Sequence, residues 1–244
     1  FYDLNTDFGG VPPYKPKDYD LREPGAMAMR ASLGGSRNTP AIKANYIAGT
    51  QNVINQAKKM GLTSGTSCEP NCGLSSAIGD GSEVKLTEHV NAFSTFARMG
   101  KTKEQTYILK IEDKKGKVIK EYKDTPGEQV LDPQIAYTIN DILSDPKASY
   151  FGNSYRLNNF RSALKTGTTN DRDNGWIMGY TPYLVLGFWS GDHENKSMAT
   201  FTENILGPAW NQFMKAAHEG KAARDWTKPA QMKTVCINTS TGYA

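Results

Sequence analysis

Apolar residues recur at helical spacing through most of the first 143 residues of the chain. Apolar side chains that recur every three or four residues lie on one face of an α-helix. The pattern predicts helices over residues 26–33, from Pro40 onward, and over 51–60, 86–99 and 135–143. The second and third helices are expected to turn inward Ile42, Tyr46 and Ile47, and Val53, Ile54, Ala57 and Met60.

Alternation of apolar and polar residues marks a pair of strands in the middle of the chain. Residues 106–111 and 118–122, on either side of a turn at 114–117, predict a β-hairpin. Three closely spaced strands are predicted over 162–168, 175–180 and 183–191. A closing amphipathic helix is predicted over 207–220, with a buried stripe of Trp210, Phe213, Met214 and Ala217.

The order of these elements predicts an α+β fold, with an antiparallel sheet packed with helices. Residues 1–24 hold four prolines and are expected to run as an extended stretch over other structure. Residues 62–82 are rich in Ser, Thr, Gly, Asn and Asp and predict a long loop, which in a compact domain is often functional. We expect one domain over residues 1–221 and a linker or tail over 222–244.

Composition narrows the class of protein. The 244 residues are 38% hydrophobic with a net charge of +4, which excludes a collagen, a coiled coil and a disordered tail. The most apolar run, 183–189, is too short to cross a membrane. Lys114, Lys115 and Lys117 are interpreted as a solvated turn, so no nucleic-acid partner is expected. Residues 1–10 do not resemble a signal peptide and lack an initiator Met, so the chain is expected to come from a longer protein.

The three cysteines leave alternatives open. Cys68 and Cys72 are separated by three residues in the loop over 62–82, and Cys236 lies near the end. The pair is compatible with a short disulfide or with free thiols. A metal site would need two more ligands, and His89 is the only nearby histidine, so none is predicted. A disulfide would indicate an oxidising compartment.

Two short motifs carry candidate chemistry. Lys165-Thr166-Gly167-Thr168 combines a cation, hydroxyl groups and a glycine that lets a ligand approach the backbone, which suits a carboxylate or other anion. The alternative is an ordinary strand with a bulge glycine. Ser36-Arg37-Asn38 lies at a break between helices, where it places a hydroxyl beside an amide. By itself that motif is typical of a helix cap or a turn.

Together the motifs resemble the transpeptidase domain of class A penicillin-binding proteins, which pairs S-x-N on a helical turn with K-T-G on a strand. The resemblance covers residues 2–215. It includes Gly25-Ala26-Met27-Ala28-Met29-Arg30-Ala31-Ser32-Leu33 before the first motif, Ala92-Phe93-Ser94-Thr95-Phe96-Ala97 between them, and Gly175-Trp176-Ile177-Met178-Gly179-Tyr180-Thr181-Pro182 and Trp189-Ser190-Gly191 after the second.

The resemblance implies the β-lactamase-like fold and a D,D-transpeptidase that crosslinks peptidoglycan stem peptides, is acylated by β-lactams and needs no cofactor. It implies that Ser36 shuttles a proton and Asn38 holds the substrate amide. Lys165 would set the field at Ser36 and at the substrate carboxylate. The substrate-binding residues would be Thr166, Gly167 and Thr168, with the two threonine hydroxyls binding that carboxylate. The resemblance also implies an extracytoplasmic location at the outer face of the cytoplasmic membrane, through an anchor in the parent protein.

One departure from the family pattern concerns the nucleophile. The family serine belongs to an S-x-x-K motif upstream of S-x-N, and no such motif precedes Ser36. The later matches at Ser82-Lys85, Ser144-Lys147 and Ser162-Lys165 are interpreted as coincidental; in a strand, residues three apart point to opposite faces. We therefore expect the chain to be the C-terminal portion of the domain, with the nucleophile on an upstream fragment of the same protein.

Two rival functions follow from other features. Absence of the nucleophile is compatible with a catalytically inactive module that binds peptidoglycan or a partner. A hydrolase would instead use acidic residues and one histidine in expected loops, namely Asp171, Asp173, Asp192, His193 and Glu194. Intact Ser36, Asn38, Lys165, Thr166 and Thr168 favour the transpeptidase over the binding module. The hydrolase residues are interpreted as solvated turn residues.

Overall fold

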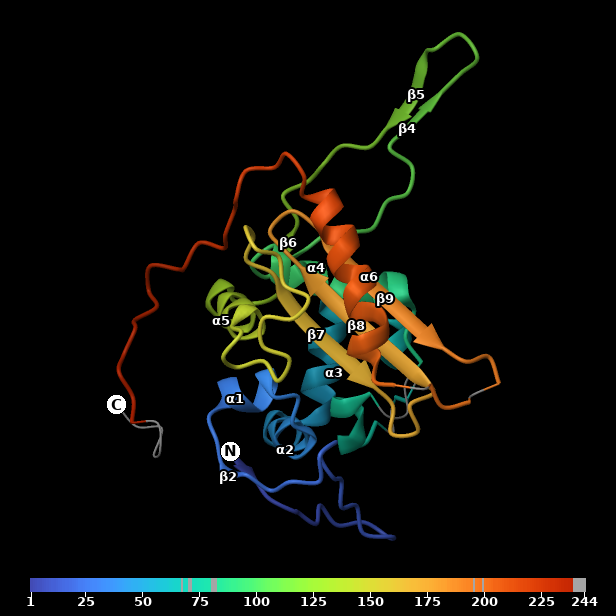
Figure 1. Cartoon of the computed structure of the whole chain (residues 1–244). Helices are drawn as coiled ribbons and strands as arrows, with labels where there is room; N and C mark the ends of the chain where they lie inside the picture. The colour runs from blue at the N-terminus through green and yellow to red at the C-terminus, as the bar shows by residue number, and fades with distance from the viewer. Residues whose placement is uncertain (67, 70–71, 80–82, 195, 199, 239–244) are drawn as a thin grey trace.

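The computed structural model describes residues 1–244 except 67, 70–71, 80–82, 195, 199 and 239–244. Its centre is an antiparallel sheet with strand order β7 (Ala163–Thr168), β8 (Asn174–Tyr180) and β9 (Val185–Gly191). Helix α6 (Thr202–Ala217) packs on the sheet in front, in the view of Figure 1, while α4 (Leu86–Ala97) lies behind it. The predicted α+β arrangement is therefore confirmed.

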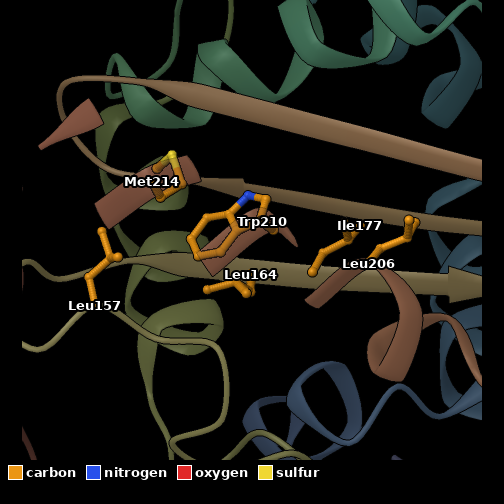
Figure 2. Packing of buried hydrophobic residues seen from close by; sticks show 6 residues of the cluster. All are labelled: Leu157, Leu164, Ile177, Leu206, Trp210 and Met214. Atoms are coloured by element: carbon orange, nitrogen blue, oxygen red, sulfur yellow. The ribbon is translucent and has the colours of Figure 1, made fainter. Parts of the chain in front are cut away.

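Successive residues of a strand point to opposite sides of a sheet. Here each side carries buried side chains, which pack in two separate clusters. Leu164 and Ile177 point toward α6 and join a cluster around Trp210 and Met214, shown in Figure 2. Ala163 and Tyr180 belong to a second cluster with Leu143, Phe93 and Phe96, from α4 and from α5 (Pro133–Ser144). The strand that carries Lys165 is thus fixed from two sides.

Helix α6 begins at Thr202, five residues before its predicted start, and Pro208 is accommodated inside it. Its buried stripe follows a four-residue spacing through Thr202, Leu206, Trp210 and Met214. The predicted inward position of Phe213 is wrong: its side chain is 50% exposed. A close approach explains the choice of stripe, since a Cβ at Gly179 would lie 2.4 Å from Cζ2 of Trp210. Only glycine lets the indole lie against β8.

Three helices precede the sheet, namely α1 (Met29–Gly34), α2 (Asn38–Ala48) and α3 (Thr50–Lys59). Helix α2 starts at Asn38, two residues before Pro40, so the proline occupies the first turn. Ile42 is buried as predicted, but Tyr46 and Ile47 are 70% and 75% exposed. Their predicted inward orientation is wrong, because within the described chain only one side of α2 is covered.

Three further strand pairs lie outside the sheet. Strand β1 (Tyr2–Asp3) pairs with β2 (Gly25–Ala26), and β3 (Lys101–Thr102) pairs with β6 (Glu128–Gln129). The predicted hairpin is confirmed as β4 (Lys110–Glu112) and β5 (Val118–Glu121), and it projects away from the body in Figure 1. No described helix is long and apolar enough to cross a membrane.

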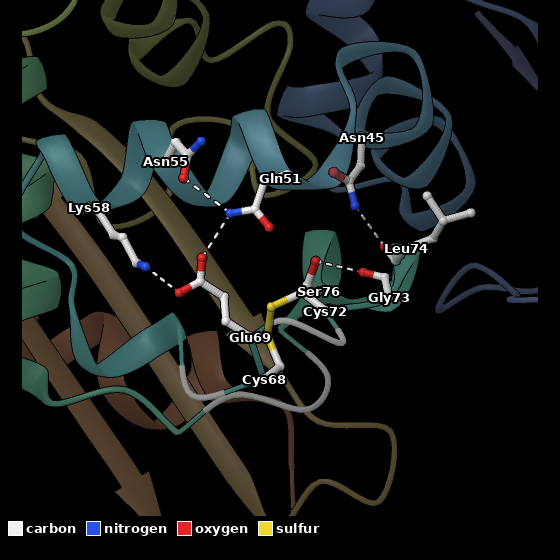
Figure 3. Close-up of a disulfide and its surroundings, with 10 residues drawn as sticks. All are labelled: Asn45, Gln51, Asn55, Lys58, Cys68, Glu69, Cys72, Gly73, Leu74 and Ser76. Carbon is white, nitrogen blue, oxygen red and sulfur yellow. Dashed lines mark hydrogen bonds and ion pairs between the residues drawn. A yellow bond between two sulfur atoms is a disulfide. The ribbon is translucent and has the colours of Figure 1, made fainter.

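The segment over 62–82 contains two short 3₁₀ helices, η1 (Ser64–Thr66) and η2 (Leu74–Ile78). Between them Cys68 and Cys72 form a disulfide, shown in Figure 3. Glu69, inside the bridged turn, accepts a hydrogen bond from Gln51 at 2.8 Å and pairs with Lys58. These contacts tie the loop to α3.

The described residues after 221 form no helix or strand, but they are not detached from the body. Trp226 is 5% exposed and packs edge-on against Tyr180. Its indole nitrogen donates to the carbonyl of Ala97 at 3.1 Å. The chain beyond the expected boundary at 221 thus contributes one side chain to the second hydrophobic cluster.

Candidate active site

The two motifs meet at a hydrogen bond between Lys165 and Ser36. The ammonium Nζ of Lys165, in the middle of β7, lies 2.7 Å from Oγ of Ser36, in the turn between α1 and α2. The same nitrogen donates to the carbonyl oxygen of Thr166 at 2.7 Å. Residues 129 apart in the chain are therefore in direct contact, as the resemblance implies.

Burial of Lys165 changes its acidity. Removing the ammonium from water disfavours its charged form and lowers the pKa of Lys165 from 10.5 to about 8, while the carboxylate of Glu203 partly opposes this shift. Near neutral pH most of the population is still protonated. The group can therefore attract an anion, and it gives up its proton more readily than a lysine in water.

Ser36 is held in an unusual backbone conformation. Its φ of 54° lies in the left-handed region, which residues other than glycine seldom adopt. The backbone N–H of Arg37, the next residue, donates to the carbonyl of Ser32 at 3.0 Å. Asn38 then opens α2, and its side-chain amide donates to the carbonyl of Lys17 at 2.9 Å. The turn thereby presents Ser36 to the strand while Asn38 is tied to the N-terminal segment.

The remaining motif residues follow Lys165 along β7. Oγ1 of Thr166 lies 2.7 Å from the hydroxyl of Tyr150, and Oγ1 of Thr168 lies 2.6 Å from that of Thr202. Gly167 between them is exposed, and a Cβ there would meet only Cβ of Trp176 at an ordinary 3.9 Å. The carbonyl of Gly167 accepts from the hydroxyl of Thr202 at 3.3 Å, but the residue itself is open to solvent, so a ligand can approach the strand at this point.

The hydrogen bond between Tyr150 and Thr166 decides whether the proton of the Thr166 hydroxyl is free for another acceptor. Burial raises the pKa of the Tyr150 phenol above its usual 10, so the phenol keeps its proton and can donate to Thr166. A threonine hydroxyl that accepts from Tyr150 keeps its own proton free for an acceptor. The pair can therefore offer one O–H donor to a further acceptor.

Sequence reasoning missed Tyr150, Thr202 and Glu203. Tyr150 lies in the loop between α5 and β7, and the other two begin α6. No periodic pattern or short motif marks any of the three. They are found only when the loop and α6 are folded onto β7.

The later S-x-x-K matches occupy other environments. Oγ of Ser144 accepts from Nε of Arg161 at 2.7 Å, and the side chain of Lys147 is exposed. Ser162 is buried, and its carbonyl accepts from Arg156 at 2.9 Å. Ser82 lies outside the described residues.

The acidic residues of the rival hydrolase lie in turns. Asp173 accepts a hydrogen bond from the hydroxyl of Thr169, and Asp192 accepts from the backbone N–H of Glu194 at 2.8 Å. The side chain of His193 is 90% exposed. Among described residues no group of three or more His, Cys, Asp or Glu side chains is placed to hold a metal ion.

Comparison with known proteins supports the same family. Residues 6–186 match the family model "Penicillin binding protein transpeptidase domain". Penicillin-binding protein 1A of Rickettsia conorii is 26% identical over 257 residues, covering 96% of this chain and 32% of the relative. Penicillin-binding protein 2D of Bacillus subtilis is 28% identical over 244 residues, covering 95% of this chain and 34% of the relative. The chain thus spans about a third of these relatives.

Solved structures show the same fold. Penicillin-binding protein 1A from Haemophilus influenzae superposes with a TM-score of 0.86 at 22% identity, over 99% of this chain and 42% of that one. PonA1 from Mycobacterium tuberculosis, in complex with penicillin V, gives 0.76 at 20% identity, over 89% and 63%. The fold and family predicted from the two motifs are confirmed, and the chain belongs to the penicillin-binding protein transpeptidase domain family.

Proposed function

We propose that this chain supplies the Ser36 and Lys165 half of a serine-type D,D-transpeptidase that crosslinks peptidoglycan stem peptides and is acylated by β-lactams. The observation that carries the proposal is the 2.7 Å contact between Nζ of Lys165 and Oγ of Ser36. A hydroxyl in contact with a lysine of lowered pKa can take up and hand on a proton. The family membership and the exposed Gly167 support the same function.

In the proposed reaction a serine on another segment attacks the carbonyl carbon of the penultimate D-alanine. The serine oxygen bonds to that carbon, the bond to the terminal D-alanine nitrogen breaks, and Ser36 passes the serine proton to the leaving amine. The nitrogen of an amine on a neighbouring stem peptide then bonds to the same carbon, the bond to the serine oxygen breaks, and that oxygen takes up the proton of the amine. Lys165, Thr166 and Thr168 bind the terminal carboxylate, and the N–H of Thr168 stabilises the oxyanion. Asn38 holds the substrate amide, and no cofactor is required.

The acylated serine is assigned to an upstream segment of the parent protein. No S-x-x-K motif precedes Ser36 in this sequence. In the described sheet β7 and β9 are the outer strands, each with one strand neighbour, and Tyr46 and Ile47 of α2 are exposed. Unpaired strand edges and apolar helix faces are normally covered in a complete domain. The disulfide fits an oxidising, extracytoplasmic compartment.

Intact mass spectrometry under denaturing conditions tests the proposal. The protein that contains this chain is purified and measured before and after incubation with a penicillin. We expect a polypeptide to gain the mass of the drug. Lys165→Ala should slow this acylation by about a hundred- to ten-thousandfold, because the proton relay and the carboxylate contact are both lost. Lys147→Ala, at an exposed lysine of a coincidental motif, is the matched control.

Two outcomes would contradict the proposal. If no polypeptide gains the drug mass but stem peptides still bind, the inactive binding module is the better function. If Lys165→Ala is acylated as fast as Lys147→Ala, the lysine has no part in the chemistry.

A further inference from the structure

Arg37, the middle residue of Ser36-Arg37-Asn38, is buried among carboxylates of the N-terminal segment. It is 7% exposed, although a guanidinium is seldom taken out of water. Nε donates to Asp3 at 2.6 Å and Nη1 to Asp20 at 2.9 Å. Nη2 donates to the carbonyl of Arg22 at 2.8 Å and lies 3.4 Å from Asp18. Residues 3–22 thus surround a side chain of the turn that carries Ser36.

Asp18 differs from the other two carboxylates because it also binds the backbone of the turn. Its Oδ1 accepts the backbone N–H of Asn38, the first residue of α2. A carboxylate there satisfies one of the free N–H groups of a helix start and interacts favourably with the helix dipole. The neighbouring carbonyl of Lys17 accepts from the side chain of Asn38 at 2.9 Å. Asp18 therefore binds both residues that follow Ser36, namely Arg37 and Asn38.

Ser36 needs such support. Its φ of 54° is unfavourable for a side chain with a Cβ, and such conformations persist only where the surroundings impose them. Arg37 and Asn38 follow it directly, and both are held by Asp18. Because a small rotation of the turn would carry Oγ away from Lys165, the 2.7 Å contact depends on that hold.

We propose that Asp18 is a positioning residue that, through Arg37 and the N–H of Asn38, keeps the Ser36 hydroxyl against the Lys165 ammonium. This inference rests on the proposed function, for which that contact is the proton relay. Asp18 itself touches neither substrate nor reacting atoms. Asp20 accepts from the same guanidinium, whereas the Asn38 N–H donates to Asp18. A variant at Asp20 therefore tests the support of Arg37 separately from the positioning of the turn.

The experiment compares three variants of the parent protein. Asp18→Ala removes both contacts, Asp18→Asn keeps an oxygen for the Asn38 N–H, and Asp20→Asn is the matched control. At saturating penicillin we expect Asp18→Ala to acylate about ten- to a hundredfold more slowly, Asp18→Asn to lie between it and wild type, and Asp20→Asn to stay within about twofold. The dissociation constant of the complex before acylation should change less than the rate.

Two results would overturn the inference. One is an Asp18→Ala variant that acylates at the wild-type rate. The other is an equal loss in Asp18→Ala and Asp20→Asn that follows an equal fall in melting temperature, since that would reflect general stability.

A second readout does not depend on acylation. Titration of the Lys165 ammonium by nitrogen NMR should give a lower pKa in Asp18→Ala than in wild type, because the protonated form loses its Ser36 acceptor. Asp20→Asn should leave that pKa unchanged. If wild type takes up no penicillin, the proposed function fails, while this titration still decides whether Asp18 places Ser36. An unchanged Lys165 pKa in Asp18→Ala would refute the positioning role.

Discussion

The two halves of the candidate site are held in place by different forces. Lys165 lies on a strand fixed by a hydrogen-bonded neighbour and by apolar clusters on both faces of the sheet. Ser36 lies on a turn fixed by Arg37 and the carboxylates around it. Apolar packing does not depend on the protonation of a side chain, whereas a buried ion cluster does. The stability of the strand that carries Lys165 should therefore not change with pH, whereas the stability of the turn that carries Ser36 should.

Trp210→Ala should have the largest effect, because it removes the centre of the cluster beneath β7 and β8. We expect a loss of about 3 to 5 kcal/mol in the free energy of unfolding. Denaturant unfolding at pH 5 and pH 8 should give the same loss. Phe213→Ala, on the exposed side of the same helix, is the control and should change stability by less than about 0.5 kcal/mol. A loss in Phe213→Ala as large as in Trp210→Ala would contradict this packing.

Arg37→Ala should lower stability by about 3 kcal/mol, because it leaves buried carboxylates without their cation. Here the loss should depend on pH. Burial and the neighbouring Asp3 already raise the pKa of Asp18 from 3.8 to about 6, and removing the guanidinium raises it further. A folded state that holds extra protons gains stability as the pH falls, so the loss should be smaller at pH 5 than at pH 8. The same unfolding series checks this, and an identical loss at both would refute the ionic role.

The smallest effect concerns the pH dependence of acylation. Since the pKa of Lys165 is lowered to about 8, its charge is progressively lost above that pH. The rate of penicillin acylation should fall about tenfold from its plateau by one pH unit above the pKa. Lys165→Arg, whose guanidinium stays charged, should be slower at neutral pH but show no such decline. The same decline in Lys165→Arg would assign it to another group.

The sequence predicted the sheet half of the site well. The three closely spaced β-runs located β7, β8 and β9 to within a few residues. The pairing of Lys165 with Ser36 followed from a family resemblance that the family match supports. Local periodicity and motif order carry this information. The roles of Asn38, Thr166, Gly167 and Thr168 in substrate binding, and the boundary at 221, stay predictions.

The support of the turn could not be predicted, because it has no periodic signal. Asp18 and Asp20 appeared only as polar residues of an extended segment. Their common partner, Arg37, is 17 or more residues away, and the way that segment folds back brings them together. The predicted inward orientations of Phe213 and Tyr46 were wrong for another reason. Helical spacing tells which residues share a face, but not which face the rest of the molecule covers.

The separation of Ser36 and Lys165 along the chain bears on the order of folding. Their contact closes a loop of 129 residues, whereas Arg37 reaches Asp3 across only 34. Closing the longer loop costs about 1 kcal/mol more in chain entropy, and contacts between distant residues form late. We therefore expect the turn to acquire its shape before it meets the strand. A newly made chain would then bring Ser36 and Lys165 together only in the last steps of its folding.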